Sequence, residues 1–365
     1  MNNDEVLLDV QHLTKSFVAD TNFFGKPTSF VQAVDDVSFQ IRRGEAFGLV
    51  GESGCGKTTI GKMLVGLLAP TSGTITFEGR DLTAMSPKER RRLCCDIQLI
   101  FQDPYASLNP RMTVGSIIAE PIRTNKILPE DQVDARVDEL LELVGLSASM
   151  RNRYPHEFSG GQRQRVGIAR ALAVNPKLIV CDEPVSALDV SVQAQVLNLL
   201  DDLKEKMGLT YLFIAHGLNV VKHVSDRVGV MYLGRLMEIT EKNELYHHPL
   251  CPYTQALLSA IPSVDPKMRR RRIILEGDVP SPIDPPVGCR FCSRCFAKVG
   301  GCDVSAPELR EVSPGHWCAC HRYDNVLADG VIAEATKIQE ISAQPAYGRD
   351  ADTIPGGMGP NGLGE

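Results

Sequence analysis

Short runs of consecutive apolar residues alternate along this chain with longer segments in which apolar residues recur every three to four positions. The runs Ala46–Val50, Leu178–Cys181 and Tyr211–Ala215 have the length of buried strands. The segments that follow the first two runs, from Ile60 and from Val192, carry one apolar face at helical spacing. Strands that alternate with helices in this way predict an α/β fold.

Two stretches depart from this alternation. Near the N-terminus, Leu7–Val10, Ser29–Ala33 and Val37–Ile41 alternate apolar and polar residues, which predicts strands of a second sheet beside the core. Residues 105–158 contain the amphipathic run Val133–Val144 and predict a helical insertion.

The composition excludes several classes of protein. The chain has 365 residues, 43% of them hydrophobic, which suffices for a sizeable core. Its net charge of -6 gives no general basic field, so nucleic acid is not expected as a principal partner. The N-terminus lacks a secretory signal pattern, and no apolar stretch approaches the roughly 18 residues of a membrane span. We therefore expect a cytosolic chain that contacts membranes only through a partner.

The strongest chemical signal follows the run Ala46–Val50. It fits the phosphate-binding pattern G-x-x-x-x-G-K-[ST] and consists of Gly51, Glu52, Ser53, Gly54, Cys55, Gly56, Lys57, Thr58 and Thr59. A glycine-rich turn at a helix N-terminus directs backbone N–H groups and the helix dipole toward an anion. Lys57 is expected to reach the β- and γ-phosphates of a nucleotide, and Thr58 to ligate Mg²⁺.

Polar residues also stand at the ends of other predicted strands. Asp182 and Glu183 follow the run Leu178–Cys181, so Asp182 can hold Mg²⁺ while Glu183 orients or deprotonates the attacking water. Gln102 ends another such strand and can place its amide oxygen near the metal. His216, at a third strand tip, is a candidate sensor of the γ-phosphate. Together with the phosphate-binding loop, these residues predict a nucleotide-hydrolysis site.

Two further features each leave two interpretations open. A second glycine-rich helix start consists of Ser159, Gly160, Gly161 and Gln162. It is either a second anion site or a helix cap without a ligand. Phe17 is either a half-buried strand residue or a platform on which an adenine ring stacks.

The chain has 11 cysteines, of which five are scattered through the first 255 residues and six crowd between positions 289 and 320. In a reducing compartment such a cluster indicates a metal site rather than disulfides. Thiolates bind zinc as well as iron-sulfur clusters, and the spacing alone does not choose between them. Reduced cysteines packed in a small domain are the remaining alternative.

The order of these motifs resembles that of the ATP-binding subunits of ABC transporters. The correspondence is Walker A at 51–59, the Q-loop at Gln102, the signature motif at 159–162, Walker B at 178–183, the D-loop at 186–189 and the switch histidine at His216. The resemblance implies a P-loop nucleotide-binding domain with an antiparallel β subdomain. It also implies that Phe17 stacks on adenine, and that ATP lies between this Walker A loop and the signature motif of a partner. One chain alone should therefore hydrolyse ATP poorly.

More narrowly, the chain is similar to the oligopeptide and dipeptide importer family. Residues 102–112, 248–254 and 277–282 carry this resemblance. It implies an ATPase that powers import of di- or oligopeptides, paired with a paralogous ATPase beneath two permease subunits and served by an extracytoplasmic binding protein. The chain would then lie peripherally at the cytoplasmic face of the inner membrane. The alternatives are import of nickel or another small solute, and a soluble ABC ATPase with a redox-sensing cysteine domain.

The same resemblance divides the chain into an ABC ATP-binding domain at 1–255 and a small cysteine-rich domain at 256–325. The remainder, 326–365, in which glycine and proline dominate from about position 345, is expected to be a largely disordered tail. Some members of the family carry a [4Fe-4S] cluster, whose ligand pattern resembles Cys289, Cys295, Cys302 and Cys320. Because Cys292 and Cys318 are additional thiols, zinc bound by neighbouring pairs stays an alternative.

Overall fold

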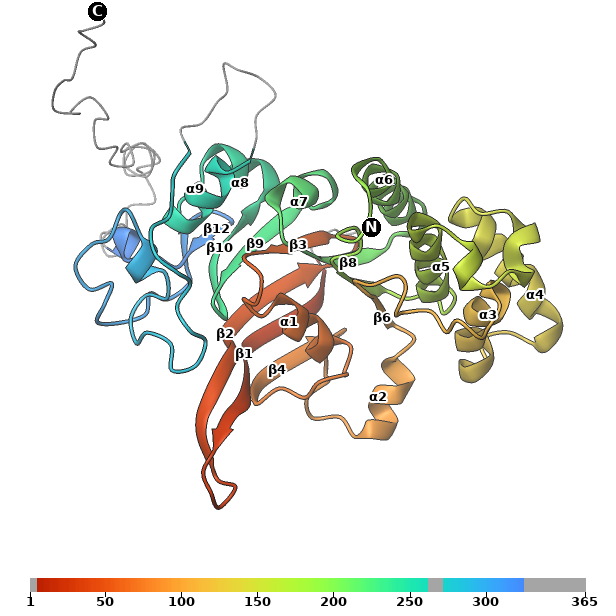
Figure 1. The fold of residues 1–365 in the computed structure, drawn as a ribbon, viewed down its shortest axis with the longest axis horizontal. Helices are drawn as coiled ribbons and strands as arrows, with labels where there is room; N and C mark the ends of the chain where they lie inside the picture. Colours follow the sequence, from red (N-terminus) through yellow and green to blue (C-terminus); the bar gives the residue numbers. More distant parts are fainter. Residues whose placement is uncertain (1–4, 262–271, 325–365) are drawn as a thin grey trace, which may run out of the picture.

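The computed structural model describes residues 5–261 and 272–324. They form two sheets and a group of helices that projects to one side (Figure 1). The predicted tail at 326–365 lies outside the described residues.

An eight-stranded mixed sheet forms the centre of the described chain, in the order β11-β12-β10-β9-β3-β8-β7-β6. Its strands are β3 (Ala46–Val50), β6 (Ile97–Ile100), β7 (Leu178–Asp182), β8 (Thr210–Ala215), β9 (Arg227–Tyr232), β10 (Arg235–Glu241), β11 (Arg310–Ser313) and β12 (His316–Cys318). The strands from β9 to β6 are parallel, whereas β10, β12 and β11 join one edge antiparallel. Every residue of β3, β7 and β8 is buried, as expected of parallel strands covered on both faces.

A four-stranded antiparallel sheet packs beside this centre, in the order β2-β1-β4-β5. Its strands are β1 (Val6–Thr21), β2 (Pro27–Arg42), β4 (Ser72–Phe77) and β5 (Arg80–Asp81). β2 is one strand where the sequence predicted two, with Asp36 at a φ of 55° inside it. Leu8 of β1 shares a hydrophobic core with Leu49 of β3 and Ile60 of α1. The second sheet therefore supports the strand and helix that flank the phosphate-binding loop.

Helices cover the central sheet and build the projecting group (Figure 1). They are α1 (Lys57–Leu64), α2 (Pro87–Leu93), α3 (Val114–Asn125), α4 (Glu130–Leu143), α5 (Gly160–Leu172), α6 (Val190–Met207), α7 (Leu218–Val224), α8 (Lys242–His247) and α9 (Pro252–Ser259). α3 and α4 lie in the predicted helical block and pack through apolar faces that include Ile118 and Val137. Among the described helices, none combines the length and apolarity needed to cross a membrane.

The described C-terminal segment, residues 272–324, extends the central sheet. Cys318 of β12 pairs with Glu238 of β10, and Trp317 pairs with Ile239. His316 Nε2 lies 2.7 Å from the carboxylate of Glu238, and both side chains are buried. Because the segment continues the sheet and its buried cysteines belong to the main core, the prediction of a separate cysteine-rich domain is not confirmed.

Candidate functional site

The phosphate-binding loop connects β3 to α1, as the sequence predicts. Lys57 opens α1 and has only 4% of its surface exposed. Its Nζ donates hydrogen bonds to the carbonyl oxygens of Gly51 at 2.7 Å and Glu52 at 3.0 Å. The first residues of the loop therefore fix the position of the lysine charge.

Gly56 shows why this loop requires glycine. Its φ is 104°, and a Cβ atom at this position would lie 2.1 Å from the carbonyl oxygen of Ala33 on β2. A larger residue would be strained and would also push the loop away from β2. No pattern in the sequence indicates that Ala33 lies beside the loop.

Two oxygen ligands suitable for a cation meet beside the loop. Thr58 Oγ1 in α1 donates a hydrogen bond of 2.8 Å to Asp182 Oδ1 at the end of β7. Burial raises the pKa of Asp182, and the hydrogen bond from Thr58 and the charges of Lys62 and Lys57 act against that rise. Carboxylate and hydroxyl oxygens are the ligands that Mg²⁺ prefers, so this donor pair fits the predicted ion.

Glu183 occupies the centre of the predicted chemistry. Gln102 Nε2 donates to its Oε2 at 2.7 Å, and His216 Nε2 lies 2.6 Å from its Oε1. Its φ of 50° is in the left-handed region, which costs a non-glycine residue on the order of 1–3 kcal/mol. The N–H of Glu183 donates to Ile214 of β8 at 3.0 Å, which helps to hold this backbone. The strained turn aims the carboxylate between Gln102 and His216.

These residues share a cavity of about 200 Å³. Its lining consists of Ala33, Ser53, Gly54, Gly56, Lys57, Thr58, Thr59, Gln102, Glu183 and His216. The structure thus brings together residues that the sequence predicted from four separate motifs. A cation, hydroxyl groups and a carboxylate face one space, which is the set of groups that phosphoryl transfer to water requires.

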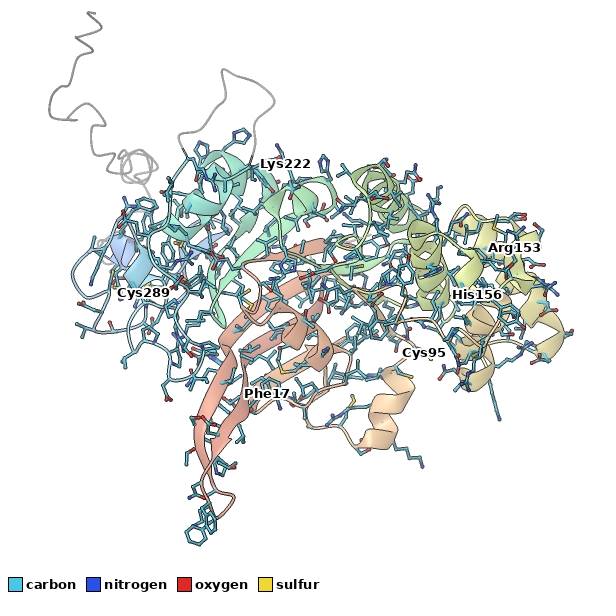
Figure 2. All side chains as sticks on the ribbon, in the orientation of Figure 1. Phe17, Cys95, Arg153, His156, Lys222 and Cys289 are labelled. Atoms are coloured by element: carbon cyan, nitrogen blue, oxygen red, sulfur yellow. The ribbon has the colours of Figure 1, made fainter. Side chains whose placement is uncertain are left out.

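The predicted signature residues do not line this cavity. Ser159 is exposed and caps α5, with its Oγ accepting from the N–H of Gln162 at 3.3 Å. The Gln162 Oε1 accepts in return from the N–H of Ser159 at 3.0 Å. Figure 2 shows nearby His156 among the projecting helices, at the other end of the molecule from Cys289. The second glycine-rich helix start therefore lies outside the cavity at the phosphate-binding loop of the same chain.

Phe17 lies on β1, where it pairs with Val31 of β2 (Figure 2). Its side chain is partly open to solvent at 39% exposure, and Lys15 Nζ lies 5.2 Å from the ring centroid. Phe17 is not among the residues that line the cavity. Its stacking on adenine stays a prediction.

The predicted metal site is not supported. Within residues 5–261 and 272–324, no group of three or more His, Cys, Asp or Glu side chains is arranged to hold a metal ion. Cys289 and Cys302 are buried in the main core, against which Cys295 and Cys320 pack. Burial raises the pKa of Cys295 to about 11 and that of Cys289 to about 12, so both are neutral thiols at pH 7. The described structure shows these cysteines buried in or packed against a shared apolar core. It gives no support for the predicted [4Fe-4S] or zinc site.

The sequence did not predict two contacts of the C-terminal segment. The thiol of Cys251 lies beside that of Cys318, although the sequence placed Cys251 outside the cysteine cluster. Arg294 lies 3.0 Å from the carboxylate of Glu52 in the phosphate-binding loop. No local pattern signals either contact, because the partners are far apart in the chain.

Two family models match this chain. A model described as ABC transporter matches residues 34–186, which include the loop, Gln102 and Glu183. A second, described as oligopeptide/dipeptide transporter, C-terminal region, matches residues 237–302.

Known proteins of similar sequence cover nearly the whole chain. The putative oligopeptide transport ATP-binding protein YkfD of Bacillus subtilis (strain 168) is 56% identical over 322 residues, 87% of this chain and 96% of its own length. This chain belongs to the oligopeptide transport ATP-binding proteins of ABC transporters. The oligopeptide transport ATP-binding protein OppF of Haemophilus influenzae is 51% identical over 325 residues, 87% of this chain and 98% of its own length. The resemblance that the motifs predicted is confirmed.

Solved structures agree with this family. The dimeric ATP-binding cassette MJ0796, in a post-hydrolysis state bound to ADP and Pi, matches with a TM-score of 0.58 and 27% identity, covering 64% of this chain and 98% of that one. CbiO1 from Clostridium perfringens, part of the ABC transporter complex cbiONQ, matches with a TM-score of 0.58 and 29% identity, covering 67% and 91%. The ATPase fold of ABC transporters, with its antiparallel subdomain, is confirmed, and this member of the family is an ATPase.

Proposed function

We propose that this chain hydrolyses ATP to power the import of di- or oligopeptides through a membrane transporter. Its relatives are named as oligopeptide transport or peptide import ATP-binding proteins. The observation that carries the proposal is the convergence of Lys57, Glu183 and His216 on one cavity beside the phosphate-binding loop. The convergence of these side chains supports ATP hydrolysis, and the names of the relatives support peptides as the transported substrate.

In this proposal the loop and α1 hold the phosphates of ATP. Backbone N–H groups of the loop and the positive end of the α1 dipole face the phosphate oxygens, and Lys57 reaches the β- and γ-phosphates. Thr58 and Asp182 hold Mg²⁺, with Gln102 close by. The ion, when bound, neutralises charge that develops on the phosphate oxygens.

Glu183 acts on the water that attacks the γ-phosphate. As a carboxylate it orients the water and accepts its proton, a role typically worth roughly 10²–10⁴-fold in rate. The hydrogen bond from Gln102 at 2.7 Å and the contact with His216 at 2.6 Å restrict its rotation. When His216 contacts the γ-phosphate or Gln102 contacts the metal, the orientation of Glu183 can therefore change with them.

The signature residues Ser159, Gly160, Gly161 and Gln162 serve the ATP of a partner subunit. Ser159 exposes the N-terminus of α5, where N–H groups and the helix dipole favour an anion. The partner is a paralogous ABC ATPase, whose own signature motif completes the site at Lys57. Two permease subunits contact the group around α3 and α4, and an extracytoplasmic binding protein delivers the substrate. The chain then lies peripherally at the cytoplasmic face of the inner membrane.

The proposal is tested by reconstituting this chain with its partner ATPase, permeases and binding protein in vesicles. Peptide is expected to stimulate ATP hydrolysis and to accumulate in the compartment opposite the binding protein. The same assembly with Glu183→Gln should do neither. Stimulation by nickel and not by peptides would overturn the assignment of cargo, and hydrolysis without any transport would overturn the assignment to import.

A further inference from the structure

A half-buried arginine connects the C-terminal segment to the phosphate-binding loop. Arg294 lies in a 3₁₀ turn (Cys292–Arg294), and its Nη1 donates to both carboxylate oxygens of Glu52, at 3.0 and 3.1 Å. The side chain of Arg294 is only 11% exposed and that of Glu52 26%. Water screens the attraction within such a shielded pair less than at the surface, and leaving either partner alone is costly.

Three aromatic rings fix this contact in place. Tyr232 and Tyr253 have ring centroids 4.7 Å apart, and Phe291 packs against both at 5.4 and 5.3 Å. Tyr253 Oη accepts from the backbone N–H of Glu52 at 3.1 Å, and Tyr232 Oη accepts from Arg294 at 3.3 Å. Glu52 is therefore held by its main chain as well as by its side chain.

The same residue holds the lysine that binds phosphate. The carbonyl oxygen of Glu52 accepts from Lys57 Nζ at 3.0 Å, next to the bond from Gly51. Arg294 thus acts on Lys57 through a single intervening residue. Arg294 does not line the cavity, so any influence on ATP must pass through the loop.

We propose that Arg294 is a positioning residue for ATP binding, through which the C-terminal segment sets the geometry of the phosphate-binding loop. A phosphate-binding loop works by presenting N–H groups and a lysine already in place, so loosening its first residues lowers affinity without removing any group that touches ATP. The inference depends on the ATPase activity of the chain and is independent of the transported cargo.

The competing explanation is that Arg294 only attaches the C-terminal segment to the rest of the protein. In that case Arg294→Gln lowers the thermal midpoint, Tm, and leaves ATP affinity unchanged. A second explanation is charge alone, because Arg294→Gln leaves the carboxylate of Glu52 unpaired near a site for an anion. The double variant Glu52→Gln/Arg294→Gln removes that charge while still lacking the ion pair, so it separates charge from positioning.

The test measures the Kd of a fluorescent ATP analogue with Mg²⁺ for the full chain, with Tm recorded for every variant. Arg294→Gln is expected to raise the Kd roughly tenfold, the effect of losing one charge-assisted hydrogen bond. Arg294→Lys should recover part of the affinity, and the double variant should stay weak. Arg310→Gln, which removes a surface ion pair with Glu308 in the same segment, is the matched control and should bind as the unmodified chain does.

In the assembled complex, the KM for ATP should rise for Arg294→Gln while kcat changes little. If Arg294→Gln fails to fold, Glu52→Gln tests the same contact from the loop and should also raise the Kd severalfold. The proposal is overturned if the Kd stays unchanged while Tm falls, or if the double variant regains full affinity.

Discussion

The cavity at the phosphate-binding loop and the signature motif at α5 are built in opposite ways. At the cavity, Lys57 and Glu183 line the space, Asp182 lies beside it, and all three are buried. Hydrogen bonds join Asp182 to Thr58 and Glu183 to Gln102. At α5, Ser159 is exposed and its polar groups are satisfied by Gln162 within the same helix turn. One region is buried and cross-linked by hydrogen bonds between elements, and the other is an exposed helix start that is satisfied locally.

Under the proposed function, the two regions act on different ATP molecules. Lys57, Glu183 and His216 line the cavity and Asp182 lies beside it, and in the proposed dimer the other side of the nucleotide faces a partner. The exposed helix start at Ser159 offers the anion-binding groups that would cover such a side in a partner. The comparison therefore predicts distinct consequences for variants in the two regions.

The largest effect is expected in the cavity, from Glu183→Gln. In the assembled complex this variant should lower ATP turnover by roughly 10²–10⁴-fold, because the amide cannot accept a proton from water. ATP should remain bound, since the loop and Lys57 are intact. Glu205→Gln on the exposed face of α6 is the control and should turn over ATP normally. Normal turnover by Glu183→Gln would remove Glu183 from the assigned role.

An intermediate effect is expected from the signature side, from Ser159→Ala. It should lower turnover of the assembled complex roughly tenfold, as expected for one hydrogen bond to a charged group. ATP binding to the isolated chain should be unchanged, since Ser159 does not line the cavity. Because the variant also loses a helix cap worth about 1 kcal/mol, Thr113→Ala, which uncaps α3, controls for stability. A loss of ATP binding by the isolated chain would contradict the separation of the two regions.

Asp182→Asn is expected to have a smaller effect, on the free energy of unfolding and its dependence on pH. Burial raises the pKa of Asp182, so ionising its carboxyl group costs more free energy in the folded state than in the unfolded state. This cost lowers the free energy of unfolding at pH values above the raised pKa and disappears below the ordinary value of 3.8. Asp182→Asn should therefore raise the free energy of unfolding at pH 7, and the gain should shrink as the pH falls toward 4. The same variant should lose the Mg²⁺ dependence of ATP binding. Urea unfolding between pH 7 and pH 4.5 measures the first effect, and equal gains at both pH values would contradict it.

The smallest effect is expected from Phe17→Ala. If the ring stacks on adenine, its removal should raise the Kd for ATP by roughly two- to tenfold, the range expected of one aromatic contact. The neighbouring strand residue Phe30, which is exposed at 45%, gives the matched control Phe30→Ala. Equal Kd values for the two variants would show that Phe17 belongs only to the β1–β2 hairpin.

The parts of the site that depend on local pattern could be predicted, and the parts that depend on distant contacts could not. Lys57, Gln102, Glu183 and His216 stand at strand or helix ends, so their motifs predict both structure and chemistry. In contrast, β12 pairs with β10 through Cys318 and Glu238, which lie far apart in the sequence. The contact beside this pair, between His316 and Glu238, spans 78 residues. No periodicity indicates such a pairing, so the C-terminal segment was predicted as a separate domain.

The burial of the cysteines and the contact of Arg294 with the loop could not be predicted, for the same reason. Cysteine spacing carries no information about burial, so it could not show that Cys289 and Cys302 pack into the main core. Likewise Arg294 and Glu52 are separated by 242 positions, and each is ordinary in its own neighbourhood. Only the folded chain brings them to within 3.0 Å.

The central claim is that the cavity of this chain is one part of a nucleotide site and that a partner supplies the rest. Its most direct test compares ATP turnover by the dilute chain alone with turnover by the same chain assembled with its partner ATPase and permeases. Turnover in the assembly is expected to exceed that of the chain alone by at least roughly tenfold, since one charge-assisted hydrogen bond already accounts for that factor. Equal turnover per chain in both states, at all concentrations, would contradict the claim.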